Sequence, residues 1–547
     1  MSSPDGDWQR LERRTVLVAA FVMAGVAAGA GLPTALGLAG DDMPLWEALA
    51  WVLAGAVPMI AAGAGADYVR WRRTRYRIGP ERAELHTGLL LVRRRSLARE
   101  RIRSVDLAAN PLLRVLGLVK VRIGTGEHSG GESTLELDAV GKAEGERLRR
   151  ELLARAAPEP GIREGELAAL DPAWLRYAPV SFVAPLLGGA AVGGVMQVSE
   201  WFGAQGKVVD WVGDRVRDTS VLWTVLVLGG AVLVAGVVGA LGLWIEMWWN
   251  YRLEREPGGT LRVRRGLFTA RSISIEERRL RGVELVEPLG VRLLGAARVD
   301  AIATGLVDDE QDKHGDLKVL LPAAPRAVAD EVAARVLRES VAPTSAAPLT
   351  AHPRAARTRR LRWALTAALL PPLVLTVLGA WLTPVLLYLA AAGAVVGLPV
   401  AVVLALDAYR ALGHGISGAY LVARSGTVRR ATVALQRGGV IGWTVKQSVF
   451  QRRAGVLTLT ATTAAGAGAY SVYDAAEDEG LAFAAEAVPG VLEPFLVADG
   501  AVPLPALPQT PSGGTPNLPA PASRRELGAP PQTPGTPFGR VLNRRTG

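Results

Sequence analysis

Two histidines lie beside acidic residues at equivalent places in the chain, and they are the first candidates for chemistry. His128 stands in the segment GTGEHSGGES and His314 in DDEQDKHGDL, each just after a Thr-Gly pair. Imidazole and carboxylate groups together could bind a transition metal. Solvated loops between strands explain the same pattern equally well, and a third related segment has Ala467-Gly468 there and no histidine. We therefore predict no metal site and no cofactor.

Other catalytic patterns are weaker. The chain has no cysteine, which excludes thiol nucleophiles, disulfides and zinc thiolates. The Gly124–Gly126 segment (GTG) lacks the following Lys-Ser/Thr of a phosphate-binding loop, and no serine lies in a nucleophile-elbow sequence. The acids in apolar segments lie near segment ends, at Glu47, Asp67, Glu246 and Asp407. Interfacial placement explains these acids, with a proton relay as the alternative. The sequence predicts no enzymatic activity.

Arginine is the prevailing charged residue. The net charge is +11, and only six of the 62 basic residues are lysine. The planar guanidinium group suits phosphates and anionic lipids, although genomic base composition also explains an excess of arginine over lysine. The candidate contacts to lipid headgroups are Arg70, Arg72, Arg73, Arg75, Arg93, Arg94, Arg95, Arg262, Arg264 and Arg265. No basic and aromatic residues interleave as in an RNA-binding sheet, so we expect no nucleic-acid partner.

The elements that must position these side chains include long apolar segments. Each has about the 20 residues that a helix needs to cross a bilayer. The six predicted spans are Thr15–Gly40, Leu45–Ala66, Pro179–Val198, Val221–Ile245, Trp363–Leu382 and Pro384–Leu406. They fall into three pairs, which predicts three transmembrane hairpins. The run Gly188–Gly194 (GGAAVGG) would let two helices pack closely.

The distribution of arginine predicts the orientation. Positive residues lie before the first span or after the second span of a pair, as in Arg10–Arg14, Arg70–Arg77 and Arg354–Arg362. The turn Gly40–Pro44, which connects two paired spans, is acidic. Because cytoplasmic flanks of spans are enriched in Lys and Arg, both termini and the polar stretches should lie in the cytoplasm. We predict a multi-pass protein of the cell membrane.

A repeated polar unit follows each hairpin. In the first two units, Tyr-Arg begins the unit and Arg-x-Arg-x-Val is followed by Arg-x-x-Gly. The distance from Val105 to Gly117 is twelve residues, and so are those from Val283 to Gly295 and from Trp443 to Gly455. Equal spacing at three places indicates a repeated supersecondary unit. The signature residues, for which we expect structural roles such as binding loop carbonyls, are Arg114, Gly117, Arg292, Gly295, Arg452 and Gly455.

Each unit is predicted to be mainly β. Segments such as Ser133–Asp138 and Val456–Thr462 alternate apolar and polar residues, which is typical of half-buried strands. Asn110-Pro111 predicts a capped helical turn that Gly117 ends in the left-handed conformation. The amphipathic segments Gly141–Ala157 and Pro325–Ser340 predict a closing helix. The pattern indicates small, partly open barrels, each plugged by a helix.

These hairpins and signatures resemble the bacterial pleckstrin-homology-like (PH-like) membrane family, in its YdbS and YdbT types. The resemblance covers about Arg70–Ala157 and Tyr251–Ser340 well, and about Tyr409–Gly490 loosely. It implies PH-like barrels carried on membrane hairpins, with no established enzymatic activity. It also implies a smaller PH-like membrane paralogue, with one hairpin and one domain, as a partner. The third unit lacks Arg-x-Arg before Trp443 and therefore diverges from the pattern.

The predicted fold is thus an α-helical polytopic membrane protein with six transmembrane helices in three hairpins and three cytoplasmic PH-like β-barrels, each closed by a C-terminal helix. The expected divisions are an N-terminus (1–14), hairpins (15–69, 177–249 and 361–407), PH-like domains (70–157, 250–340 and 408–490), linkers (158–176 and 341–360) and a disordered Pro-rich tail (491–547).

The functional hypothesis follows from this architecture. We expect a non-catalytic scaffold or binding protein, whose PH-like domains bind anionic lipid or partner proteins at the inner face of the membrane. Basic segments near that leaflet gain about 1 kcal/mol per arginine. The alternative is a component of a lipid or peptide transport or antimicrobial-resistance complex, which polar residues inside a six-helix bundle would favour.

Overall fold

The computed structural model describes residues 8–40, 43–88, 93–102, 104–124, 134–153, 165–180, 183–201, 203–217, 220–305 and 317–492. His128, His314 and all but the first two residues of the expected tail lie outside these ranges. The candidate metal loops and the disorder of the tail therefore stay predictions.

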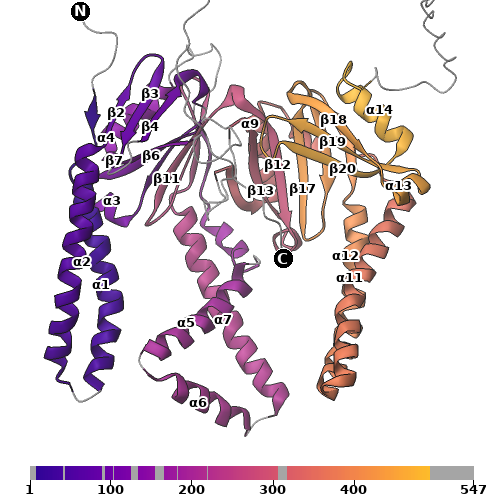
Figure 1. The fold of residues 1–547 in the computed structure, drawn as a ribbon. Coiled ribbons are helices and arrows are strands. Elements are labelled where there is room, and N and C mark those ends of the chain that lie inside the picture. Colours follow the sequence, from indigo (N-terminus) through magenta and orange to yellow (C-terminus); the bar gives the residue numbers. More distant parts are fainter. Residues whose placement is uncertain are drawn as a thin grey trace, which may run out of the picture. The chain divides into compact units, whose positions relative to one another are not determined.

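Three helical hairpins are present, and Figure 1 shows the paired helices of the first and third running side by side. Their helices are α1 (Thr15–Gly40) with α2 (Leu45–Arg73), α5 (Val183–Trp201) with α7 (Val221–Trp248), and α11 (Arg354–Trp381) with α12 (Pro384–Arg410). A further helix, α6 (Gln205–Arg217), lies between α5 and α7. At Gly188 the carbonyl of Val232 leaves no room for a side chain, so α5 and α7 pack closely through small residues.

Five helices of the described chain are long and apolar enough to cross a membrane: α1, α2, α7, α11 and α12. The prediction of six spans is not confirmed, because α5 is not among them. That helix has 19 residues and ends with the polar residues Gln197, Ser199 and Glu200, which shorten its apolar length. A multi-pass membrane protein is nevertheless supported by the other five.

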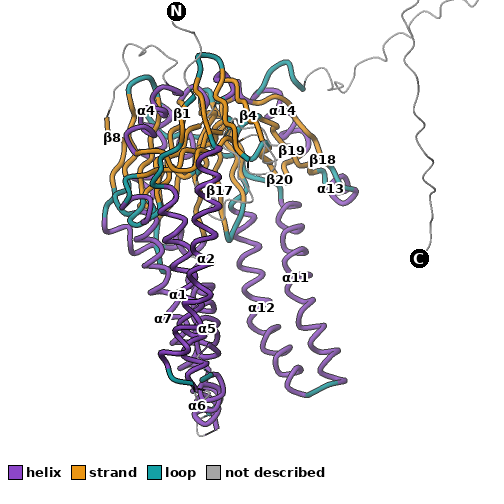
Figure 2. Tube along the Cα trace, turned by 60° about the vertical axis from the view of Figure 1, so that its left-hand side comes forward, coloured by secondary structure: helices purple, strands orange, loops and turns teal. Residues whose placement is uncertain are grey.

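The strands form three consecutive units along the chain, one after each hairpin. Figure 2 shows the strands gathered at one end of the long helices. Unit 1 contains β2 (Arg75–Ile78), β3 (Arg82–Thr87), β4 (Arg93–Ala98), β5 (Ser104–Ala109), α3 (Pro111–Val115), β6 (Leu118–Gly124), β7 (Thr134–Gly141) and α4 (Lys142–Leu153), and β1 (Gln9–Arg10) joins it. Unit 2 contains β9 (Arg252–Glu256), β10 (Thr260–Arg265), β11 (Ala270–Glu276), β12 (Leu280–Pro288), α8 (Leu289–Leu293), β13 (Ala296–Ala303), β14 (Val319–Pro325) and α9 (Arg326–Leu337).

Unit 3 repeats the same order of strands and helices. It contains β15 (Gly413–Ser417), β16 (Tyr420–Ser425), β17 (Arg429–Gln436), β18 (Val440–Lys446), α13 (Val449–Arg453), β19 (Val456–Thr463), β20 (Ala469–Ala476) and α14 (Glu477–Ala487). The expected linkers also hold short elements, namely β8 (Gly165–Ala169) with a 3₁₀ turn (Pro172–Tyr177), and α10 (Pro343–Ala346).

Two of the four sheets combine strands from consecutive units. The strand orders are β1-β2-β3-β4, β7-β6-β5-β11-β10-β9-β8, β14-β13-β12-β17-β16-β15 and β18-β19-β20, with every pairing antiparallel. Thus β5 of unit 1 pairs with β11 of unit 2, and β12 of unit 2 pairs with β17 of unit 3. Among the described strands no sheet closes on itself, so the predicted barrels are not confirmed. At the two junctions between units, β5 and β12 pair instead with a strand of the next unit.

Three hydrophobic cores nevertheless follow the repeat. One core contains Ile102, Val121 and Leu148 of unit 1. A second is centred on residues of unit 2, and the third on residues of unit 3 that include Phe483 of α14. Each core is thus centred on one unit and includes residues of the helix that follows the unit's last strand. The cores are not separate from their neighbours, because the second includes Tyr420 and Val422 of unit 3 and the third includes Ile302 of unit 2.

The signature turns form as local sequence chemistry dictates. The Asn110 side chain accepts a hydrogen bond from the Leu113 N–H (2.8 Å) at the start of α3, and Ser448 forms a capping box with Gln451 at the start of α13. The glycines after these turns have positive φ angles, 69° at Gly117 and Gly295 and 61° at Gly455, where a side chain would be strained.

Candidate functional site

A cavity of about 320 Å³ lies where hairpin 1 meets unit 1. One part of its wall is apolar and comes mainly from α1, with Val18, Val22 and Met23. The other part is polar and comes from the end of α2 and from β6 and β7. It contains Asp67, Arg70, Lys120 and Asp138, and the signature turn adds Asn110 and Leu113. The cavity is therefore amphiphilic and opens at the end of two helices that can cross a membrane.

Ion pairs hold the polar wall together. Asp138 pairs with Arg70 and, at 3.0 Å, with the Lys120 ammonium group. Arg70 lies 4.0 Å from Asp67, and about half of its side-chain surface is exposed. The chain before α1 is fastened nearby, because the Trp71 indole N–H donates to the Leu11 carbonyl (2.7 Å). A charged headgroup could exchange with Asp138 here while an acyl chain lies along α1.

The ten candidate headgroup arginines differ in solvent exposure. Arg70, Arg72 and Arg73 lie in the last turn of α2 and Arg75 in β2, all exposed. On β4, Arg93 and Arg94 are exposed and Arg95 is half-buried; on β10, Arg264 is exposed. Two of the ten, Arg262 and Arg265, are buried. Alternation along β10 places Arg262 and Arg264 on one face of the strand, but it does not show that Glu146 of unit 1 contacts Arg262 while Arg264 stays exposed.

The signature arginines connect consecutive units. The Arg114 guanidinium of α3 donates to the Leu267 carbonyl (2.5 Å) in the β10–β11 loop of unit 2. The same loop is bound by Glu246 of α7, whose carboxylate accepts hydrogen bonds from the backbone N–H groups of Phe268 and Thr269 (2.8 and 2.9 Å). Glu246, near the end of α7, and Arg114 of unit 1 thus both bind the β10–β11 loop of unit 2.

Units 2 and 3 repeat this arrangement with a direct ion pair. Arg292 of α8 contacts Asp407 near the end of α12 at 2.7 Å, and Thr427 of the β16–β17 loop donates to the same carboxylate (2.6 Å). In unit 3 the corresponding Arg452 is exposed on α13. Glu246 and Asp407 therefore have structural partners at the membrane boundary, which explains them without a proton relay.

We expect Arg292→Ala to lower the free energy of unfolding by about 1.5–3 kcal/mol, because it removes a charge-assisted hydrogen bond from a partly buried carboxylate. Thermal unfolding of the purified protein in detergent measures the loss. Arg217→Ala at the tip of hairpin 2, whose ion pair with Asp214 is exposed, is the control and should cost well under 1 kcal/mol. Equal effects of the two substitutions would contradict the structural role of Arg292.

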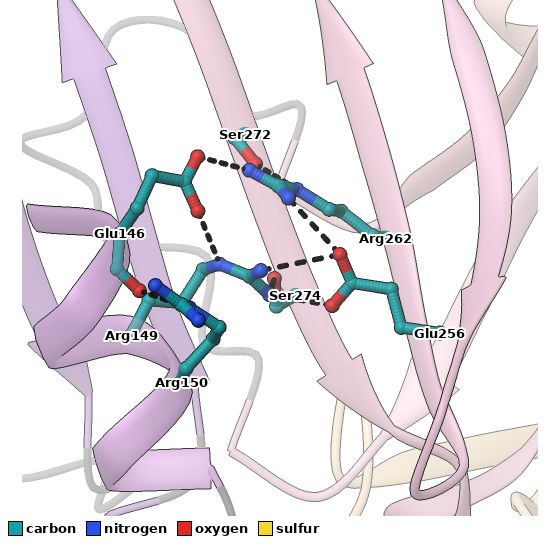
Figure 3. Close-up of polar contacts among 7 residues, drawn as sticks. All are labelled: Glu146, Arg149, Arg150, Glu256, Arg262, Ser272 and Ser274. Atoms are coloured by element: carbon teal, nitrogen blue, oxygen red, sulfur yellow. Dashed lines mark hydrogen bonds and ion pairs between the residues drawn. The ribbon is translucent and has the colours of Figure 1, made fainter. Parts of the chain in front are cut away.

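A buried ion network joins unit 1 to unit 2 (Figure 3). Arg149 of α4 contacts Glu256 at 2.7 Å and Glu146 at 3.1 Å, and Arg262 of β10 contacts the same two carboxylates at 3.0 and 2.5 Å. Both arginine side chains are only 4% exposed. Each arginine also donates to a hydroxyl group on β11, Arg262 to Ser272 (2.7 Å) and Arg149 to Ser274 (3.2 Å). Four alternating charges thus fix the angle between the closing helix of one unit and the sheet of the next.

A second buried polar cluster lies at the base of hairpin 3. His352 and His414 lie with Nε2 and Nδ1 3.0 Å apart, and His352 Nδ1 is 3.2 Å from the Asp474 carbonyl. The Asp474 side chain is 1% exposed and bonds to Arg359, Arg360 and Gln451. Burial, together with the smaller effect of the neighbouring His352, lowers the pKa of His414 to about 4.

Sequence reasoning missed this pair because 62 residues and a whole hairpin separate the two histidines. The only available signal was their position, one just before α11 and one just after α12, since the ends of a hairpin are close in space. No group of three or more metal-ligating side chains is found in the described part of the chain.

Comparisons with known proteins agree with the architecture. A family model for the bacterial PH domain matches residues 18–156 and 367–487, which include units 1 and 3 with parts of their hairpins. The UPF0699 transmembrane protein YdbT of Bacillus subtilis (strain 168) is 23% identical over 274 residues. That match covers 47% of this chain and 55% of the relative, so the chain spans about half the length of the curated relative it matches. No solved structure matches.

Proposed function

Because this chain belongs to the bacterial PH-like family of membrane proteins, we propose that it is a non-catalytic membrane scaffold that binds anionic lipid at the inner face of the cell membrane. The amphiphilic cavity at the base of hairpin 1 is the observation that carries this proposal. Its apolar wall belongs to α1, which can cross the bilayer, and its polar wall comes from the end of α2 and from unit 1, which supports an amphiphilic ligand.

The charges around the cavity favour an anionic ligand. Arg70 and Lys120 balance Asp67 and Asp138 inside it, while the adjoining segment 10–14 adds three arginines and one glutamate. Arg72 and Arg73 lie exposed in the same last turn of α2 as Arg70. The surplus of positive charge lies before α1 and at the end of α2, next to unit 1. Such a surplus attracts a leaflet that contains anionic phospholipid, and it is consistent with a cytoplasmic orientation of the units.

The test uses the full-length protein purified in detergent, with thermal unfolding followed as phosphatidylglycerol or phosphatidylcholine is added. We expect phosphatidylglycerol to raise Tm more than phosphatidylcholine does, and the difference to shrink at high salt. The double variant Arg70→Gln, Lys120→Gln should bind phosphatidylglycerol about tenfold more weakly, since it loses both cations of the polar wall.

Arg217→Gln, at the exposed tip of hairpin 2, serves as the matched control and should leave lipid stabilisation unchanged. Equal stabilisation by the two lipids, or an undiminished effect in the double variant, would contradict a specific anionic-lipid site in this cavity.

A further inference from the structure

The two junctions between units are built in the same way. At the first, Val105 of β5 lies opposite Ser274 of β11, and at the second, Val283 of β12 lies opposite Ala434 of β17. Val105 and Val283 are the residues twelve positions before the signature glycines. In both cases the fourth strand of one unit (β5 or β12) pairs with the third strand of the next unit (β11 or β17), and the register is the same.

Loop contacts accompany each strand pairing. Arg114 binds the Leu267 carbonyl across the first junction. Across the second, the Leu289 N–H at the start of α8 donates to the Val428 carbonyl (2.8 Å), and Glu287 pairs with Arg430 at 3.0 Å. The signature helix of one unit therefore always lies against the loop before the third strand of the next unit.

Unit 3 has the equivalent strand edge, on β18, and no strand of another unit pairs with it in the described chain. Trp443 of β18 occupies the place of Val105 and Val283, and β18 pairs only with β19 there (Figure 1). Two apolar residues of β18 are exposed to solvent, Ile441 to 66% and Val445 to 43%. The residues equivalent to Val445 in units 1 and 2, Leu107 and Leu285, are buried. On α13, Val449 and Phe450 are also exposed, and Val449 corresponds to Leu289.

We propose that β18 and α13 dock a fourth unit of the same fold, supplied by a separate polypeptide. Its third strand would lie antiparallel to β18, and the loop before that strand would cover Val449 and Phe450. An edge strand with open apolar residues favours strand addition, and the two internal junctions show the occupant that this edge takes. The inference rests on the proposed scaffold function and gives it a partner and a surface.

A second copy of this chain fits the edge less well. Its free third strand is β4, and the register of the internal junctions would place Arg93 directly opposite Lys446, where like charges destabilise the pairing. The exposed Arg93 and Arg94 instead protect β4 as the polar end of the array, as terminal repeats require. The array is therefore capped at unit 1 and open at unit 3, and the partner strand has a neutral or acidic residue opposite Lys446.

The test introduces a photo-crosslinking amino acid at Phe450 of the full-length protein in its native membrane. We expect a covalent adduct whose crosslinked peptide, identified by mass spectrometry, lies just before or in the third strand of a PH-like unit in another protein. The same probe at Val115, which is exposed on α3 of an occupied junction, is the matched control and should give no such adduct.

The variant Ile441→Lys, Val445→Lys adds two charges to the exposed edge and should reduce the adduct about tenfold. Its unfolding temperature and its stabilisation by phosphatidylglycerol should stay unchanged, which separates this inference from lipid binding in the cavity of hairpin 1. An adduct to residues 93–98 of a second copy would overturn the assigned partner. Adducts only to lipid, or an adduct that survives the double substitution, would overturn the docking surface.

Discussion

Replacing Glu256 by glutamine is expected to lower the free energy of unfolding by about 3 kcal/mol. This carboxylate is shared by Arg149 and Arg262, whose side chains are each 4% exposed. Without its charge, the two guanidinium groups share Glu146 alone, and one positive charge stays buried without compensation. Breaking a buried pair by removing one partner costs far more than breaking a surface pair. Denaturant unfolding in detergent micelles, followed by circular dichroism, measures the change.

The matched control is Glu136→Gln, because Glu136 forms an ion pair with Arg122 at a similar distance (2.7 Å) but is about half exposed. We expect a cost below about 1 kcal/mol there. Hydrogen exchange should also localise the effect of Glu256→Gln to α4 and β9–β11, the elements that the network joins. A loss no larger than that of the control would show that the network does not hold the junction.

The network also sets a pH dependence. Burial alone raises the pKa values of Glu146 and Glu256, but hydrogen bonds and charges from Arg262 and Arg149 outweigh burial and leave both pKa values below their ordinary value of 4.5. The unfolded carboxyl groups therefore bind protons first as the pH falls. The stabilisation is complete above pH 4.5 and is lost as the pH drops through the lowered folded values. Glu256→Gln should weaken this acid dependence.

Unit 3 is expected to lose about 3 kcal/mol of stability as the pH falls from 6.5 to about 4, because His414 must stay neutral in the folded state. Its folded pKa of about 4 lies below the ordinary value of 6.5, so the unfolded chain takes up the proton first. The stabilisation is thus fully present above pH 6.5 and is lost below it. The pKa of His352 is lowered in the same direction by burial, although contacts with Asp474 oppose the shift.

The groups around the pair explain why charging is costly. His414 packs against the Phe483 ring and faces His352, while Arg359 and Arg360 already occupy the Asp474 carboxylate. A protonated His414 would therefore bring a third positive charge to one carboxylate. Hydrogen exchange of β20 and α14 between pH 4 and 7 reports on this unit alone.

His414→Leu removes the titrating group and should flatten the pH profile of unit 3 even if it changes stability at neutral pH. His86→Asn is the control, since His86 is half-buried on β3 of unit 1 and should leave the profile of unit 3 unchanged. A steep pH dependence that persists in His414→Leu would show that another group is responsible.

Local chemistry explains why the sequence predicted as much of the fold as it did. Asn110 and Ser448 cap their helices through residues three positions away, and the glycines that follow adopt positive φ because no side chain opposes it. The hairpins were equally predictable, apart from α5, because apolar length is a property of a single segment. The match to the bacterial PH domain bears out the resemblance drawn from the repeated signatures.

The candidate sites were less predictable, because they depend on neighbours. Alternation along β10 shows that Arg262 and Arg264 share a face of the strand, but not that α4 of another unit covers Arg262. Likewise, no spacing rule joins His352 to His414 or Arg292 to Asp407, which meet only after the hairpins have formed. The cavity beside Arg70 requires walls from five separate elements, namely α1, α2, α3, β6 and β7.

The sequence by itself determined the hairpins, the threefold repeat, the capped turns and which residues of each strand are apolar, since all of these follow from residues close together along the chain. Only the tertiary structure decided which strand edges meet. A strand's side chains specify its faces, but its edges carry the same backbone N–H and C=O groups everywhere. The pairing of β5 with β11 and of β12 with β17 therefore depended on packing between units, and the same packing leaves β18 open.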